Sequence, residues 1–178
     1  MTGRHERPTS AHIPKENIPM LTAAAVPRGV PAVVVIAHTL AVLYTTGFVW
    51  TLQLMDYPMV ARLRGEASTA YMAAHNGMFW RVLAPGLITA GVTALILVFV
   101  RPAGVPPAVP LVVLALLALI IVLSGAVATP DRLDLADEFS AATHAHLLKV
   151  SWIRTSAFTV WSGIDAWLLW KTIQGKGA

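Results

Sequence analysis

The chain has 178 residues, of which 56% are hydrophobic and only 12% are charged. A water-soluble domain carries about 25% charged residues, so this composition favours a protein that lies in a lipid bilayer. The chain has no cysteine, which excludes disulfides, thiolate-bound metals and covalently attached c-type haem. The formal charge of +4 is scattered along polar segments and forms no basic stripe, which argues against a nucleic-acid partner.

The first thirty residues are polar, interrupted by prolines and without periodicity. They lack the apolar core of a signal peptide, so we expect a flexible polar tail over residues 1–30. The rest of the chain, 31–178, is expected to form one membrane domain.

Four stretches of that domain are apolar over the roughly 20 residues that a bilayer crossing requires. They cover residues 31–55, 82–100, 108–129 and 150–170. The expected fold is an all-α integral membrane protein, a bundle of four transmembrane helices with a multi-pass location in the cell membrane.

The connections between these spans differ in character. Arg101 and four prolines predict a tight, non-helical turn between spans two and three. The two longer connections, 56–81 and 129–149, have helical spacing and predict two polar connecting helices on the opposite side. The side that holds both termini carries seven lysines and arginines against five on the other side, which favours cytoplasmic termini.

The stretch EFSAATHAHLLKVSWIRT leads into the fourth span and contains two histidines. On a helix, Ser151, Thr155 and Ser162 project within about 20° of His144, so these residues predict one polar face turned into the bundle. His146 projects about 200° away and is expected to meet water or headgroups. The two histidines therefore do not form a metal site, and we expect no metal or other cofactor.

Three residues at the end of span one, together with His75 and His144, are expected to share one level near the outer interface. The three are Gln53, Asp56 and Tyr57. His38 lies about five helical turns away and is not expected to join them. Ionisable side chains are costly inside a bilayer, so such a group is a candidate site.

Each of these residues also has a structural interpretation. His144 and His75 are then helix-end histidines bonded to a carbonyl or to water. Arg154 lies about one turn inside its span and would form an ion pair with Asp131 or Asp56. Asp165 would reach the headgroups or Lys171.

The chain resembles the family of small four-span membrane proteins related to anthrone oxygenase. The resemblance rests on LQLMDYP at the end of span one, on YMAAHNGMFWRVLAPG leading into span two, and on HLLKVSWIRTSAFTVWSG at the start of span four. It covers roughly residues 31–170. Members often have an asparagine just before the tryptophan of the last segment, where this chain has Ser151, so no role is transferred to that position.

The resemblance implies a membrane enzyme that oxidises a lipophilic, anthrone-like aromatic with dioxygen and without a cofactor. His144 or His75 would remove an activated C–H proton, and Gln53, Tyr57 or Arg154 would stabilise the resulting oxyanion. Asp56 completes the candidate catalytic set.

Two other classes of function stay open from the residues alone. The chain is a non-catalytic accessory protein if the polar stripes only hold helices together, as serine and threonine often do in membranes. It is a haem-binding redox subunit if His75 and His144 are axial ligands. The expected partners are the bilayer, a lipophilic small molecule, and either further copies of the chain or another membrane protein.

Overall fold

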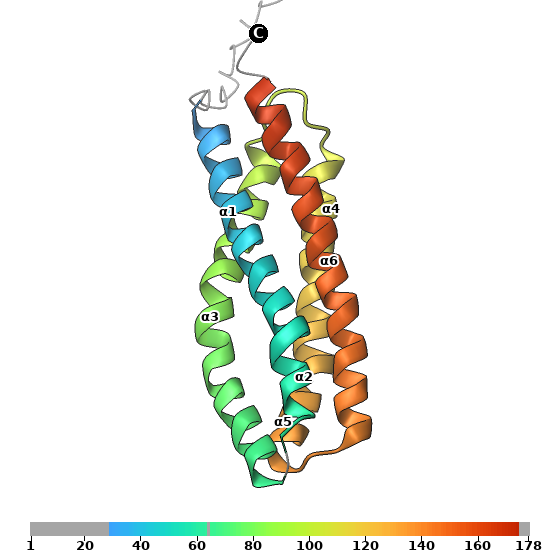
Figure 1. Ribbon diagram of the computed structural model, residues 1–178. Helices are drawn as coiled ribbons and strands as arrows, with labels where there is room; N and C mark the ends of the chain where they lie inside the picture. Colours follow the sequence, from blue (N-terminus) through green and yellow to red (C-terminus); the bar gives the residue numbers. More distant parts are fainter. Residues whose placement is uncertain (1–28, 64, 175–178) are drawn as a thin grey trace, which may run out of the picture.

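The computed structural model describes residues 29–63 and 65–174, so nearly all of the tail expected at 1–30 lies outside the described residues. Within the described ranges the chain is helical and contains no strand, which confirms the all-α prediction. The long helices run side by side (Figure 1).

The first helical rod joins three elements without a break: α1 (Val30–Thr51), the π-helical turn η1 (Leu52–Asp56) and α2 (Tyr57–Val60). Pro31 lies in the first turn of α1, where its missing N–H would have no helical partner in any case. The rod ends before Gly65, which has a φ of 55°. That backbone conformation is strained for side-chain-bearing residues, so glycine fits the reversal of the chain into the next helix.

The second rod is α3 (Glu66–Phe99), and the third joins α4 (Ala108–Val122), the π-helical turn η2 (Leu123–Ala128) and α5 (Thr129–Asp137). The fourth is α6 (Ala141–Gln174). The proline-rich segment between α3 and α4 is the expected non-helical turn, and Gly104 has a φ of 77° there.

Both π-helical turns end two residues before a proline, at Pro58 and at Pro130. Proline has no N–H, and its ring clashes with the carbonyl four residues earlier. The wider π turn accommodates this mismatch: the N–H of Tyr57 bonds to the carbonyl of Leu52, five residues back. The extra residue in a π turn rotates the side chains that follow it about the helix axis. Such turns are frequent at functional sites.

The helices pack in a closed order, in which α1 contacts α3 and α6, and α4 also contacts α3 and α6. Gly86 of α3 faces Tyr44 and Thr45 of α1, and a Cβ at this position would lie 2.5 Å from the Tyr44 ring. A glycine therefore permits the close approach of α1 and α3, as small residues do between membrane helices.

Three helical segments are long and apolar enough to cross a membrane: Val30–Val60, Glu66–Phe99 and Ala108–Asp137. They cover the first three predicted spans except for Val100 at the end of the second. The fourth predicted span lies in α6, which does not meet the same criterion within the described residues because polar and charged side chains are spread along it.

The two segments predicted as polar connecting helices are largely helical, and each is continuous with a longer helical rod. Residues 66–81 form the first half of α3, which runs on into the apolar half with Pro85 inside the helix. The second connection is divided: α5 continues the α4 rod, whereas residues 141–149 begin α6. The helix that contains the second predicted span therefore begins at Glu66, sixteen residues before the expected start of that span at residue 82.

Candidate functional site

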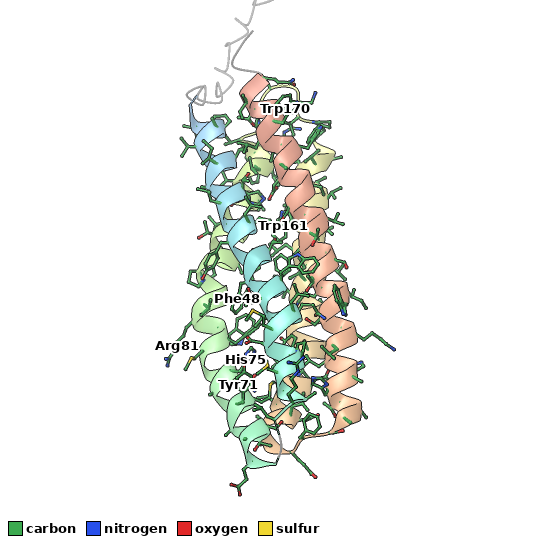
Figure 2. All side chains as sticks on the ribbon, viewed as in Figure 1. Phe48, Tyr71, His75, Arg81, Trp161 and Trp170 are labelled. Carbon is green, nitrogen blue, oxygen red and sulfur yellow. The ribbon has the colours of Figure 1, made fainter. Side chains whose placement is uncertain are left out.

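A cavity of about 300 Å³ lies between the first rod and α3. Its lining is mostly apolar and includes three aromatic rings and one histidine; the lining residues are Phe48, Asp56, Tyr71, Ala74, His75, Met78, Phe79 and Val82. Figure 2 shows Phe48, Tyr71 and His75 in the space between these helices, while Arg81 projects away from it. Ala74, Met78 and Val82 are exposed, so the cavity opens on the outer surface of α3.

Asp56 is the polar centre of the cavity wall. Its Oδ1 accepts a 2.8 Å hydrogen bond from the hydroxyl of Tyr71, and its Oδ2 lies 3.5 Å from Nδ1 of His75. Tyr71 and His75 are four residues apart on α3, so both side chains leave the same face of that helix. The π turn η1 ends at Asp56 and directs its carboxylate at this face.

The second ring nitrogen of His75, Nε2, differs from Nδ1 in its contacts. Nε2 is buried and makes no hydrogen bond with any of the described residues. With Nδ1 directed at a carboxylate, the neutral imidazole carries its proton on Nδ1 and a lone pair on Nε2. A histidine that serves as a base has this pattern of contacts: a carboxylate orients one nitrogen, and the other is not engaged by any of the described residues.

Tyr57 and Arg154 form a second layer behind the cavity wall. Tyr57 is completely buried, and its ring centroid lies 5.8 Å from that of His75. Arg154 donates through one Nη to the hydroxyl of Tyr57 at 3.2 Å and to Ser151 Oγ at 3.3 Å. The ion pair predicted between Arg154 and Asp131 or Asp56 was wrong, because Asp131 pairs with His146 and Asp56 with His75.

Arg132 is a second buried arginine at this level. Its guanidinium lies 3.8 Å from the centroid of Phe79, which lines the cavity, and donates to Thr129 Oγ1 at 2.7 Å. Among the described residues, neither Arg132 nor Arg154 has a carboxylate within ion-pair distance. A positive field therefore lies behind the wall that carries Asp56 and His75.

Gln53, the remaining predicted site residue on the first rod, is 3% exposed. Its Oε1 is buried and has no hydrogen-bond partner among the described residues. It lies in η1 beside Asp56, on the buried side of the π turn.

His144 is buried, and its Nε2 donates to the backbone carbonyl of Tyr57 at 2.7 Å. This contact matches the structural interpretation of His144, because the nitrogen that would face a reactant is engaged by the backbone. The opposite directions expected for the two α6 histidines are confirmed: the side chain of His146 is 54% exposed and bonds to Asp131 at 2.8 Å.

Five of the six predicted site residues divide into two layers, and Gln53 is buried without a link to either among the described residues. Asp56 and His75 line the cavity, whereas Tyr57, Arg154 and His144 are linked behind it by hydrogen bonds. Tyr71, Arg132 and Phe79 were not predicted as site residues. The spacing of Tyr71 and His75 on one helical face was a usable signal for Tyr71; Arg132 lies in an acidic segment and gave no such signal.

Comparison of the chain with protein-family models, curated proteins and solved structures finds no match.

Proposed function

We propose that the protein is a membrane enzyme that removes a proton from a lipophilic aromatic substrate and lets dioxygen oxidise the resulting carbanion. The observation that carries the proposal is the Asp56–His75 pair in the wall of an apolar cavity, with Nε2 of His75 unpartnered among the described residues. The resemblance to anthrone-oxygenase-like proteins supports the same class of substrate. A cavity of about 300 Å³ with aromatic walls suits a flat hydrophobic molecule.

The reaction balances without a cofactor. Nε2 of His75 takes a proton from the activated CH₂ of an anthrone, and the electron pair spreads into the ring ketone as an enolate. The carbanion carbon bonds to dioxygen, and return of the proton gives a hydroperoxide. Loss of water from that H–C–O–OH group forms the second carbonyl, so one anthrone and one O₂ become one quinone and one H₂O.

The second layer assists the proton-transfer step through its charge. Negative charge develops on the ketone oxygen as the proton leaves, and fixed positive groups in an apolar site stabilise such charge strongly. Arg132 lies against Phe79, and Arg154 bonds to Tyr57, whose ring lies beside His75. Both guanidiniums thus favour the enolate over the neutral ketone.

The same proposal includes a four-span bundle in which α6 also crosses the membrane. The charged groups in the middle of α6, Arg154 and Asp165, are 1% and 0% exposed, so they face the other helices. The outward face is apolar; its exposed residues include Trp152, Ile153, Val160 and Trp167. Low mean hydropathy in α6 then reflects buried polar groups and is compatible with a lipid-facing exterior.

Cysteine labelling tests this topology cleanly, since the natural chain has no cysteine. We expect Ala103→Cys and Gln174→Cys to react with a membrane-impermeant maleimide from the same side, and Asp137→Cys from the opposite side. Intact and lysed cells distinguish the two sides, and cytoplasmic termini predict that only Asp137→Cys reacts in intact cells. Labelling of Gln174→Cys and Asp137→Cys from one side would show that α6 does not cross.

A variant that fills the cavity tests substrate binding. Ala74 lines the cavity, whereas its neighbour Ala73 does not, and both are exposed. We expect Ala74→Trp to weaken binding of anthrone at least about tenfold, because an indole occupies the volume that the ligand needs. Quenching of tryptophan fluorescence in nanodiscs gives the affinity.

Ala73→Trp is the matched control and should bind anthrone as the natural chain does. Equal affinities for the two variants would place the ligand elsewhere or remove anthrone-like molecules from consideration. No acceleration of anthrone oxidation by the natural protein, with binding intact, would reduce the proposal to a binding protein.

The redox-subunit alternative has less support from the geometry. Axial ligation of one haem needs both imidazoles to turn a nitrogen toward a common iron. Nε2 of His144 is instead bonded to a backbone carbonyl, and Nδ1 of His75 faces Asp56. If the protein is instead a non-catalytic accessory protein, substitution of any of its histidines by alanine should leave its function unchanged.

A further inference from the structure

A second polar cluster lies far from the cavity, in the half of the molecule that contains both described chain ends. His38 of α1 and Asp165 of α6 are both completely buried, and Nε2 of His38 lies 3.4 Å from Oδ1 of Asp165. His38 precedes Asp56 by 18 residues on one rod, which corresponds to about 27 Å at 1.5 Å per residue. The expectation that His38 stays apart from the cavity residues is confirmed. The expectation that Asp165 reaches the headgroups was wrong.

The contacts of His38 fix where its first proton lies. Nδ1 is 2.8 Å from Oγ1 of Thr93. The Thr93 hydroxyl donates its own hydrogen to the carbonyl of Thr89 at 2.6 Å. With that hydrogen directed at a carbonyl, Thr93 accepts from His38, and Nδ1 carries a proton in this arrangement.

Nε2 then faces Asp165 in one of two states. If Nε2 holds a lone pair, it accepts from Nε1–H of Trp161 at 3.4 Å, and a carboxylate beside it would be an uncompensated buried charge. Asp165 must then be the protonated acid. If Nε2 is protonated, His38 is an imidazolium and Asp165 is a carboxylate. Both states hold one proton more than a neutral histidine beside an aspartate anion.

Within the described part of the chain, His38 is the only basic group within ion-pair distance of Asp165. The α4 helix and the stretch of α3 from Pro85 to Phe99 contain no Asp, Glu, Lys, Arg or His. On α1 the other ionisable side chain is Tyr44, whose hydroxyl donates to the carbonyl of Val82. On α6 the next charged residue toward the C-terminus is Lys171, whose ammonium lies 5.9 Å from the Trp167 ring. The pair must balance its own charge.

We propose that His38 and Asp165 form a buried proton-binding site that shares one exchangeable proton between an imidazole and a carboxyl group. A metal ion fits less well, because the described residues offer no third histidine or carboxylate there. Ionisable side chains inside membrane helices commonly bind and release protons as members of proton relays. This site is separate from the cavity, so it does not depend on the proposed oxidation.

Spectroscopy of the protein in nanodiscs at pH 8 tests the site, with ¹³C-labelled aspartate and ¹⁵N-labelled histidine. We expect either the C=O stretch of a protonated carboxyl group or one histidine with both nitrogens protonated. Asp165→Asn should remove whichever signal is present. The matched control is Asp131→Asn, which breaks the exposed His146–Asp131 pair and should leave the signal intact.

Asp165→Glu provides a second variant that keeps the carboxyl group and should shift the signal without removing it. The proposal is overturned if the natural protein at pH 8 shows only ionised carboxylates and singly protonated histidines. It is also overturned if the signal persists in Asp165→Asn. The first of these outcomes is measured on the natural protein alone, so the test survives a variant that does not fold.

Discussion

Replacing His75 by alanine should lower the rate of anthrone oxidation by about 10²- to 10⁴-fold, the usual contribution of a positioned general base. Nε2 of His75 has no hydrogen-bond partner among the described residues, and no other histidine among them lines the cavity. Oxygen consumption and quinone absorbance, corrected for the uncatalysed reaction, give the rate. Binding of anthrone should change little, because the substituted side chain is one of several in an apolar wall.

Two further variants separate a catalytic histidine from a structural one. Asp56→Asn should also lower the rate, by a smaller factor, since an amide can hold the ring but does not stabilise the imidazolium that forms. His146→Ala removes a histidine that likewise pairs with an aspartate, but at the surface, and should have no effect. Normal turnover by a folded His75→Ala protein would refute the proposed base.

Replacing Arg154 by methionine should lower turnover about tenfold to hundredfold while the protein stays at least as stable to heat. Arg154 is 1% exposed, and its Nε and one Nη have no hydrogen-bond partner among the described residues. A buried charge without a carboxylate costs stability, so an apolar side chain of similar volume is tolerated or stabilising. Loss of the Arg154 guanidinium, however, removes positive charge that favours the enolate.

The readout of Arg154→Met is the separation of kcat from KM, together with the midpoint of thermal unfolding. A fall in kcat with unchanged KM and no loss of stability is the expected pattern. The exposed Lys149, five residues earlier on α6, gives the control Lys149→Met, which should alter neither quantity. A destabilised Arg154→Met protein with normal turnover would assign Arg154 a structural role instead.

The first three spans and the proline-rich turn were predictable because they depend on local properties. Long apolar runs and prolines act within one helix or one turn, and their effect does not need a partner. The length of α3 was not predicted, because residues 66–81 are polar enough to resemble a separate segment. The helix nevertheless continues through them, from Glu66 to Phe99, with Pro85 inside it.

In the candidate site, too, local helix geometry was predictable and contacts between helices were not. Projection on an ideal helix placed His144 inward and His146 outward correctly, because both lie on the uninterrupted helix α6. It could not show that Nε2 of His144 meets the carbonyl of Tyr57, which belongs to another rod. Asp165 was misjudged for the same reason: its neighbour on the chain is Lys171, but its partner in space is His38.

The sequence by itself determined that this is an all-helical protein rich in membrane-type segments, without thiol chemistry, and with histidines and carboxylates at the ends of apolar helices. Only the tertiary structure decided which of them meet. It paired Asp56 with His75 and Tyr71 at a cavity, left two buried arginines without carboxylates among the described residues, and closed His38 on Asp165. The physical reason is that helix periodicity fixes which side of a helix a residue faces, whereas the packing order and the two π turns fix what it faces.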